Sequence, residues 1–187
     1  MYRFMAYFKN QNHKPDDAHE LLLTARTLVD SAKITIRDLR ISTMHIEIDV
    51  SVHIISDLEK AKSRLLSLGE FIEADEVHER ILTKEDAISL ARELFNSEKY
   101  WSTHEVLEGV WKISTGEEKD LLNGIILVAA AMVHFQKNEI EVGISILKRA
   151  KAKLSKSKFT YHTIDMDLLK KNITQLIKTS NIEIFTI

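Results

Sequence analysis

Residues 44–54 read MHIEIDVSVHI, and this alternation decides the fold of the first part of the chain. Methionine, isoleucine and valine occupy the even positions, whereas histidine, acidic residues and serine occupy the odd ones. Successive side chains of a β-strand point to opposite faces of the sheet. The pattern therefore predicts a strand with one buried face and one solvated face.

The segments around this strand predict an α+β domain over residues 1–82. Apolar runs indicate strands, apolar residues at a spacing of three and four indicate helices, and Gly69 is a typical helix end. In order, we expect strand 3–8, helix 16–32, strands 33–41 and 44–54, helix 57–68 and strand 70–77. The order strand-helix-strand-strand-helix-strand predicts a ferredoxin-like (βαββαβ) domain.

The remaining residues, 83–187, predict an all-α helical bundle. Thr83 followed by acidic residues is typical of a helix start. Further helices are expected over 98–113, 117–137, 139–155 and 165–179, with a short apolar strand at 182–187. Residues 121–135 are apolar on almost every side, so their helix should form the centre of the bundle.

Composition excludes several classes of function. The 187 residues contain no cysteine, which excludes disulfides and thiolate metal sites, and five glycines form no phosphate-binding motif. We therefore expect no nucleotide or flavin cofactor. A net charge of −2 disfavours nucleic acid as a partner, although residues 148–158 are rich in lysine.

The sequence also predicts a cytoplasmic protein that does not insert into membranes. It has no apolar run of the length needed to span a bilayer, and residues 1–10 do not resemble a signal peptide. Its high isoleucine and charge content is typical of thermophile proteins.

An unusual set of side chains lies on the helix expected over 98–113. At about 100° per residue, five side chains share a sector of about 120°. They are Trp101, His104, Leu107, Glu108 and Trp111. An imidazole and a carboxylate therefore lie where a bundle helix usually has leucine, and we expect both to face inward. A buried carboxylate needs a charged, hydrogen-bonded or metal partner.

The next helix offers such partners. Asn123 and His134 share one of its faces, with small residues between them, and could meet His104 and Glu108. Two imidazoles and one carboxylate would bind a divalent transition metal and leave positions open for water. In this interpretation His104, His134 and Glu108 are metal ligands, and Glu108 or Glu105 is the catalytic base. Trp101, Trp111 and Asn123 would bind or orient a small-molecule substrate.

A structural interpretation of the same residues stays open. Helix bundles also bury hydrogen-bonded pairs of histidine with glutamate or asparagine, which fix the packing of the helices without a metal. The protein would then be a non-catalytic regulatory or interaction protein. Its sheet domain would form a homodimer.

The same region resembles a known family. The residues that carry the resemblance are Leu94-Phe95-Asn96, Tyr100-Trp101, His104 to Glu108, Trp111, Asn123 to Ile126, Ala129 to Ala131, His134-Phe135 and Asn138. Over residues 84–155 they resemble the domain of unknown function 309 family. The resemblance implies a compact α-helical domain and a metal-dependent hydrolase.

Five polar residues match polar positions of the family pattern: His104, Glu105, Glu108, Asn123 and His134. The chain departs from that pattern at two positions. Ser102 stands where a glutamate is common, and Leu127 stands where a glutamine is common.

Overall fold

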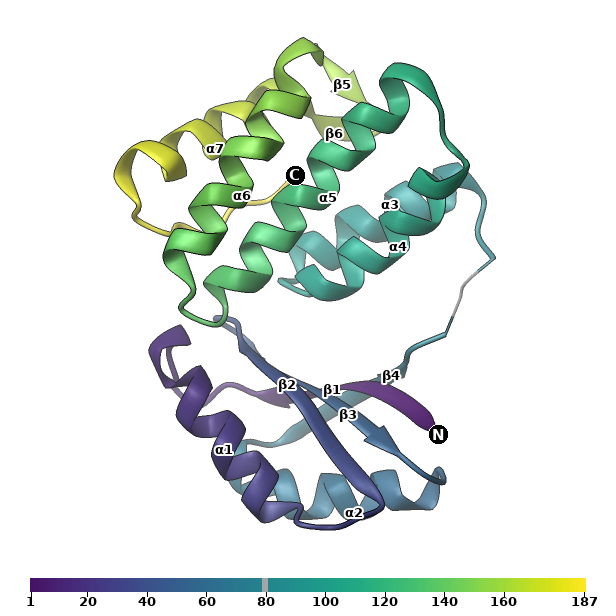
Figure 1. Cartoon of the computed structure of the whole chain (residues 1–187), viewed down its shortest axis with the longest axis vertical. Coiled ribbons are helices and arrows are strands. Elements are labelled where there is room, and N and C mark those ends of the chain that lie inside the picture. Colours follow the sequence, from purple (N-terminus) through teal and green to yellow (C-terminus); the bar gives the residue numbers. More distant parts are fainter. Residues whose placement is uncertain (79–80) are drawn as a thin grey trace. The chain divides into compact units, whose positions relative to one another are not determined.

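The computed structural model describes residues 1–78 and 81–187 and divides into two units. One unit comprises residues 1–78 with 136–138, and the other comprises 79–135 with 139–187. Each unit has its own hydrophobic core. The first contains an antiparallel sheet and the second is helical, which confirms the α+β class (Figure 1).

The first unit contains a four-stranded sheet and two helices. Its elements are β1 (Tyr2–Lys9), α1 (Ala18–Leu28), β2 (Ile34–Ile41), β3 (His45–Val52), α2 (Ser56–Leu65) and β4 (Phe71–Glu76). The strands lie in the order β2-β3-β1-β4, and every neighbouring pair is antiparallel. Both helices lie on the same face of the sheet (Figure 1).

The even positions of β3 form the centre of this core, as the alternation predicts. Ile46, Ile48, Val50 and Val52 are fully buried against apolar residues of α1 and α2. Gly69, just before β4, passes so close to β1 that an added Cβ would lie 2.3 Å from the carbonyl oxygen of Lys9. A larger residue would push the two segments apart there.

The prediction that one face of β3 is exposed to solvent is wrong. His45, Glu47, Asp49 and Ser51 are all at most 5% exposed. The burial of Glu47, Asp49 and Ser51 is possible because neighbouring strands supply polar partners instead of water. Asp49 accepts two hydrogen bonds from Arg3 of β1, at 3.0 and 2.6 Å, and Ser51 accepts one from Arg37.

Arg40 of β2 is the central cation of this second face. It is 2% exposed and pairs with Glu47, which is 1% exposed, and with Asp38 at 3.1 Å. Burial by itself would lower the pKa of the Arg40 guanidinium, but the two carboxylates hold that pKa above its ordinary value. Loss of one partner would leave a buried charge without compensation.

In its described residues, the second unit is built from five α-helices and a small hairpin. The helices are α3 (Lys84–Asn96), α4 (Tyr100–Ile113), α5 (Gly116–Phe135), α6 (Ile140–Lys153) and α7 (Met166–Thr179). The hairpin consists of strands β5 (Thr160–Tyr161) and β6 (Ile164–Asp165) and lies between α6 and α7 in the sequence. Thr83 caps α3, since its side chain accepts a hydrogen bond from the backbone of Asp86. The sequence did not predict the hairpin.

Helix α5 is central to the helical unit and packs against both α4 and α6. Two glycines allow a close approach. A Cβ added to Gly124 of α5 would lie 2.5 Å from the Leu154 side chain, and one added to Gly143 of α6 would lie 2.2 Å from the Phe135 ring. The distance between α5 and α6 therefore depends on the absence of side chains at these positions.

Residues 182–187 form no strand, contrary to expectation. The segment contacts α3 instead, where the Phe185 ring lies 5.5 Å from that of Phe95. The side chains of Arg92 and Asn96 hydrogen-bond the Ile187 backbone, which removes the need for a partner strand. Among the described residues, no helix has the length and apolar character needed to cross a bilayer.

Replacement of Gly143 by alanine should destabilise the protein, because the new methyl group meets the buried Phe135 ring. We expect the free energy of unfolding in urea to fall by about 1–3 kcal/mol. Gly109→Ala is the matched control, because Gly109 is exposed within α4 and a Cβ there meets nothing within 4 Å. It should raise stability by about 0.5–1 kcal/mol. Equal effects of the two substitutions would contradict the close helix approach.

Candidate functional site

Helix α4 lies between α3 and α5 and buries one of its sides. The buried side chains are those of Tyr100, Thr103, Leu107 and Val110. Thr103 is tolerated there because its hydroxyl donates a hydrogen bond of 3.1 Å to the carbonyl of Lys99, one turn earlier. This packing fixes which side of α4 remains accessible.

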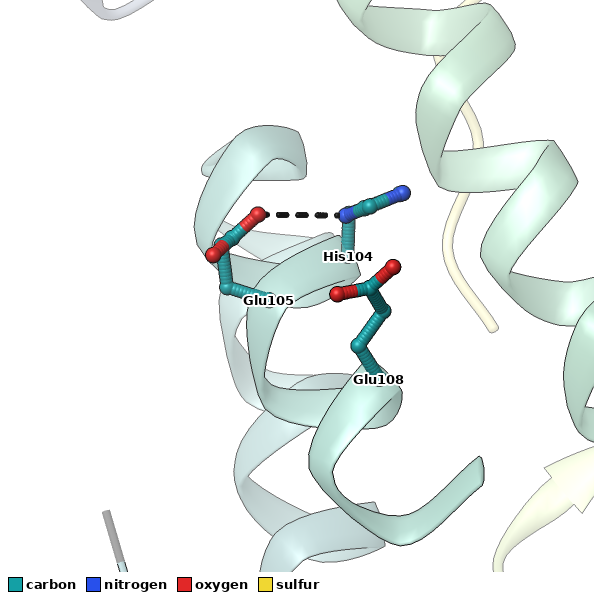
Figure 2. A group of neighbouring side chains, drawn as sticks. All are labelled: His104, Glu105 and Glu108. Carbon is teal, nitrogen blue, oxygen red and sulfur yellow. Dashed lines mark ion pairs between the residues drawn. The ribbon is translucent and has the colours of Figure 1, made fainter. Parts of the chain in front are cut away.

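Three potential metal ligands meet on the flank of α4. His104, Glu105 and Glu108 each offer one nitrogen or oxygen atom, and these atoms all lie within 4.8 Å of one another. All three side chains come from one stretch of the helix (Figure 2). The Glu105 carboxylate faces the His104 ring, with 3.4 Å between Oε1 and Nδ1. We call these three residues the His-Glu-Glu cluster.

The cluster is accessible to solvent, whereas the sequence predicted that His104 and Glu108 face inward. The side chains of His104, Glu105 and Glu108 are 29%, 44% and 37% exposed. The helix is rotated relative to the expectation because Thr103 and Val110, not His104 and Glu108, take the inward positions. Open space next to Gly109 leaves the same side of the helix uncovered.

The donor atoms of the cluster are of the types that bind a divalent cation. One imidazole and two carboxylates are donors that suit zinc, manganese or iron, and they carry up to two negative charges. Three protein ligands leave coordination positions for water or a substrate. A lysine already competes for part of this charge, since Nζ of Lys112 lies 3.7 Å from Oε2 of Glu108.

The other predicted residues of this helix flank the cluster. Trp101 and Trp111 are both partly buried on α4. Nζ of Lys119 lies 4.6 Å from the centre of the Trp111 ring, a cation–π contact that holds the indole in place. Asn123 is partly buried on α5 and does not belong to the His-Glu-Glu cluster.

His134 is not part of the cluster either. It lies in the last turn of α5, where its Nδ1 contacts a carboxylate oxygen of Glu139. Glu139 immediately precedes α6, and its backbone N–H donates to the carbonyl of His134 at 2.9 Å. The chain reversal after α5 thus gives His134 a local partner. The cluster contains Glu105 in the place where the sequence predicted a second imidazole.

A separate hollow of about 370 Å³ lies elsewhere in the helical unit. The start of α5, the end of α6 and the β5–β6 hairpin contribute its lining, which includes Glu118, Lys153, Lys156 and Tyr161. Hydrogen bonds from Lys84 and Tyr161 hold the pKa of Glu118 below its ordinary value. Burial and the Glu118 carboxylate raise the pKa of the Tyr161 phenol. Sequence spacing gave no signal for this hollow, because its residues lie in distant segments.

His104→Ala should leave stability almost unchanged, because the half-exposed His104–Glu105 contact contributes little. We expect the free energy of unfolding to fall by less than about 1 kcal/mol. Leu107→Ala on the same helix is the reference, since Leu107 is 1% exposed and its truncation should cost about 2–5 kcal/mol. A large loss for His104→Ala would show that the cluster stabilises the bundle.

Comparison with known proteins finds a similar solved structure and a matching family model. A conserved hypothetical protein from Thermus thermophilus, known from a crystal structure, is 30% identical. The similarity covers 49% of this chain and 95% of that one, with a TM-score of 0.44. A search of curated proteins gave no match.

Residues 88–145 match the family described as Domain of unknown function (DUF309). This segment begins in α3, ends in α6 and includes all of α4 and α5. The part of the chain that matches this family is therefore the part that carries the His-Glu-Glu cluster.

Proposed function

We propose that the helical unit binds a divalent transition metal through His104, Glu105 and Glu108 and acts as a metal-dependent hydrolase. The observation that carries this proposal is the convergence of three ligand atoms within 4.8 Å on the accessible side of α4. Two carboxylates this close repel each other unless a cation lies between or beside them. A metal ion would remove that repulsion.

The arrangement also suits hydrolysis. A divalent ion bound here would lower the pKa of a coordinated water and supply a nucleophile near neutral pH. The protein ligands come from one side only, so a substrate can approach from the solvent. The two tryptophans of α4 offer apolar surfaces on either side of the cluster along the helix, and Lys112 offers a positive charge to an anionic substrate.

We also infer that the first unit is ferredoxin-like. The proposal rests on its element order and on a sheet order of β2-β3-β1-β4 with antiparallel neighbours and both helices on one face. This unit contributes no residue to the His-Glu-Glu cluster. We therefore expect metal binding to require the helical unit alone.

Titration with zinc or manganese should show one site in the tag-free protein, measured by calorimetry. His104→Ala should weaken its affinity by more than about tenfold, since a ligand is removed. Glu105→Gln and Glu108→Gln should also weaken it, because an amide carries no negative charge. Affinity should fall as the pH is lowered, since protons compete with the metal for the same atoms.

His19→Ala is the control, because His19 is an exposed histidine on α1 outside the cluster. It should bind metal as the unaltered protein does. Equal affinity of the His104→Ala and His19→Ala proteins would contradict the proposed site. Hydrolysis of p-nitrophenyl esters and phosphate diesters should likewise require added metal and should be lost in His104→Ala. If the protein binds metal but shows no metal-dependent hydrolysis, the proposed metal site is supported and the proposed hydrolase activity is contradicted.

A further inference from the structure

The sheet of the first unit has two edges, and within residues 1–78 and 81–187 the contacts that protect an edge lie at β2. At the β2 edge, the side chain of Arg26 donates hydrogen bonds of 3.1 Å to the carbonyls of Ile36 and Arg37. The pairing of β2 with β3 also shifts register between Ile36 and Asp38. An occupied carbonyl edge and a bulge both discourage the addition of another strand.

The β4 edge has backbone groups available for pairing. The N–H of Val77 donates to the carbonyl of Arg3 at 2.8 Å, and Asp75 and Glu73 lie opposite Met5 and Tyr7. In an antiparallel pair, residues directed at the partner alternate with residues directed away from it. The N–H and C=O groups of Ala74 and Glu76 therefore point away from β1, and among the described residues no strand lies on that side of β4.

The chemistry of β4 selects a partner. Residues 70–76 read EFIEADE, with four acidic residues and no basic one. Glu70, Glu73 and Glu76 are exposed, and Asp75 is half-exposed. Two copies paired edge to edge through β4 would bring like charges together, which disfavours a symmetrical dimer at this edge. A strand rich in lysine or arginine would instead face complementary charges.

We propose that the outer edge of β4 is a docking site for an extended basic segment of a partner protein, which adds to the sheet as a fifth strand. Main-chain hydrogen bonds to Ala74 and Glu76 supply the affinity, as in other cases of strand addition. The exposed carboxylates of Glu70 and Glu76 select basic sequences. This site is independent of the His-Glu-Glu cluster, so neither proposal depends on the other.

The test uses the full chain and a fluorescein-labelled, end-blocked peptide of alternating lysine and threonine. Fluorescence anisotropy should show binding that weakens with salt, and the matching glutamate–threonine peptide should not bind. Ala74→Pro should weaken binding by about tenfold or more, because proline lacks the outward N–H. Ala74→Ser keeps that N–H and should bind within about twofold of the unaltered protein.

Two further measurements separate strand addition from loss of folding and from simple charge attraction. The double variant Glu70→Lys/Glu76→Lys changes only exposed side chains and should abolish the preference, so that the basic and acidic peptides bind about equally, because the two new lysines offset Glu73 and Asp75. Hydrogen exchange should show new protection of the Ala74 and Glu76 amides in the complex.

Three outcomes would overturn the proposal. The first is equal binding of the lysine and glutamate peptides to the unaltered protein. The second is equal binding of the basic peptide to Ala74→Pro and Ala74→Ser. The third is self-association of the unaltered protein that Ala74→Pro abolishes, which would assign the β4 edge to a second copy of this chain.

Discussion

The packing of α4 determines the chemistry of the helical unit. This helix is held between α3 and α5 and buries Tyr100, Thr103, Leu107 and Val110. Because only that side is enclosed, one imidazole and two carboxylates are left together at the border between core and solvent. Hydrophobic packing thus fixes the backbone, and the backbone places the donors. In the proposed function, a metal ion would bind to side chains of one helix, without ordering a loop.

The two units differ in how they handle polar groups. In the sheet unit, acidic residues of β3 are buried because arginines of β1 and β2 pair with them. In the helical unit, acidic residues near His104 stay half-exposed, with Lys112 at 3.7 Å as a weak partner. The buried acidic groups of β3 are already neutralised by their arginine partners. The acidic groups near His104 are more exposed to solvent, and the proposed function assigns them an external cation as partner.

The period of apolar residues predicted the helices α1 to α7, the strands β1 to β4 and the α+β class, because each of these elements buries one face. It predicted neither the β5–β6 hairpin nor the absence of a strand at residues 182–187. Periodicity could not predict that Glu47 and Asp49 are buried, since their arginine partners lie on other strands. Periodicity correctly placed His104 and Glu108 on one side of α4, but the prediction that this side faces inward was wrong. Thr103 takes an inward position instead, because its hydroxyl forms a hydrogen bond within the helix. His134 lies outside the cluster and contacts Glu139, five residues later in the chain.

The most direct test is a crystal structure of the tag-free protein grown with zinc, with data collected at the zinc absorption edge. The proposed site predicts an anomalous peak on the flank of α4, about 2.0–2.2 Å from one nitrogen of His104 and from oxygens of Glu105 and Glu108. Absence of a peak there, or a zinc ion bound at His134 and Glu139 in its place, would contradict it.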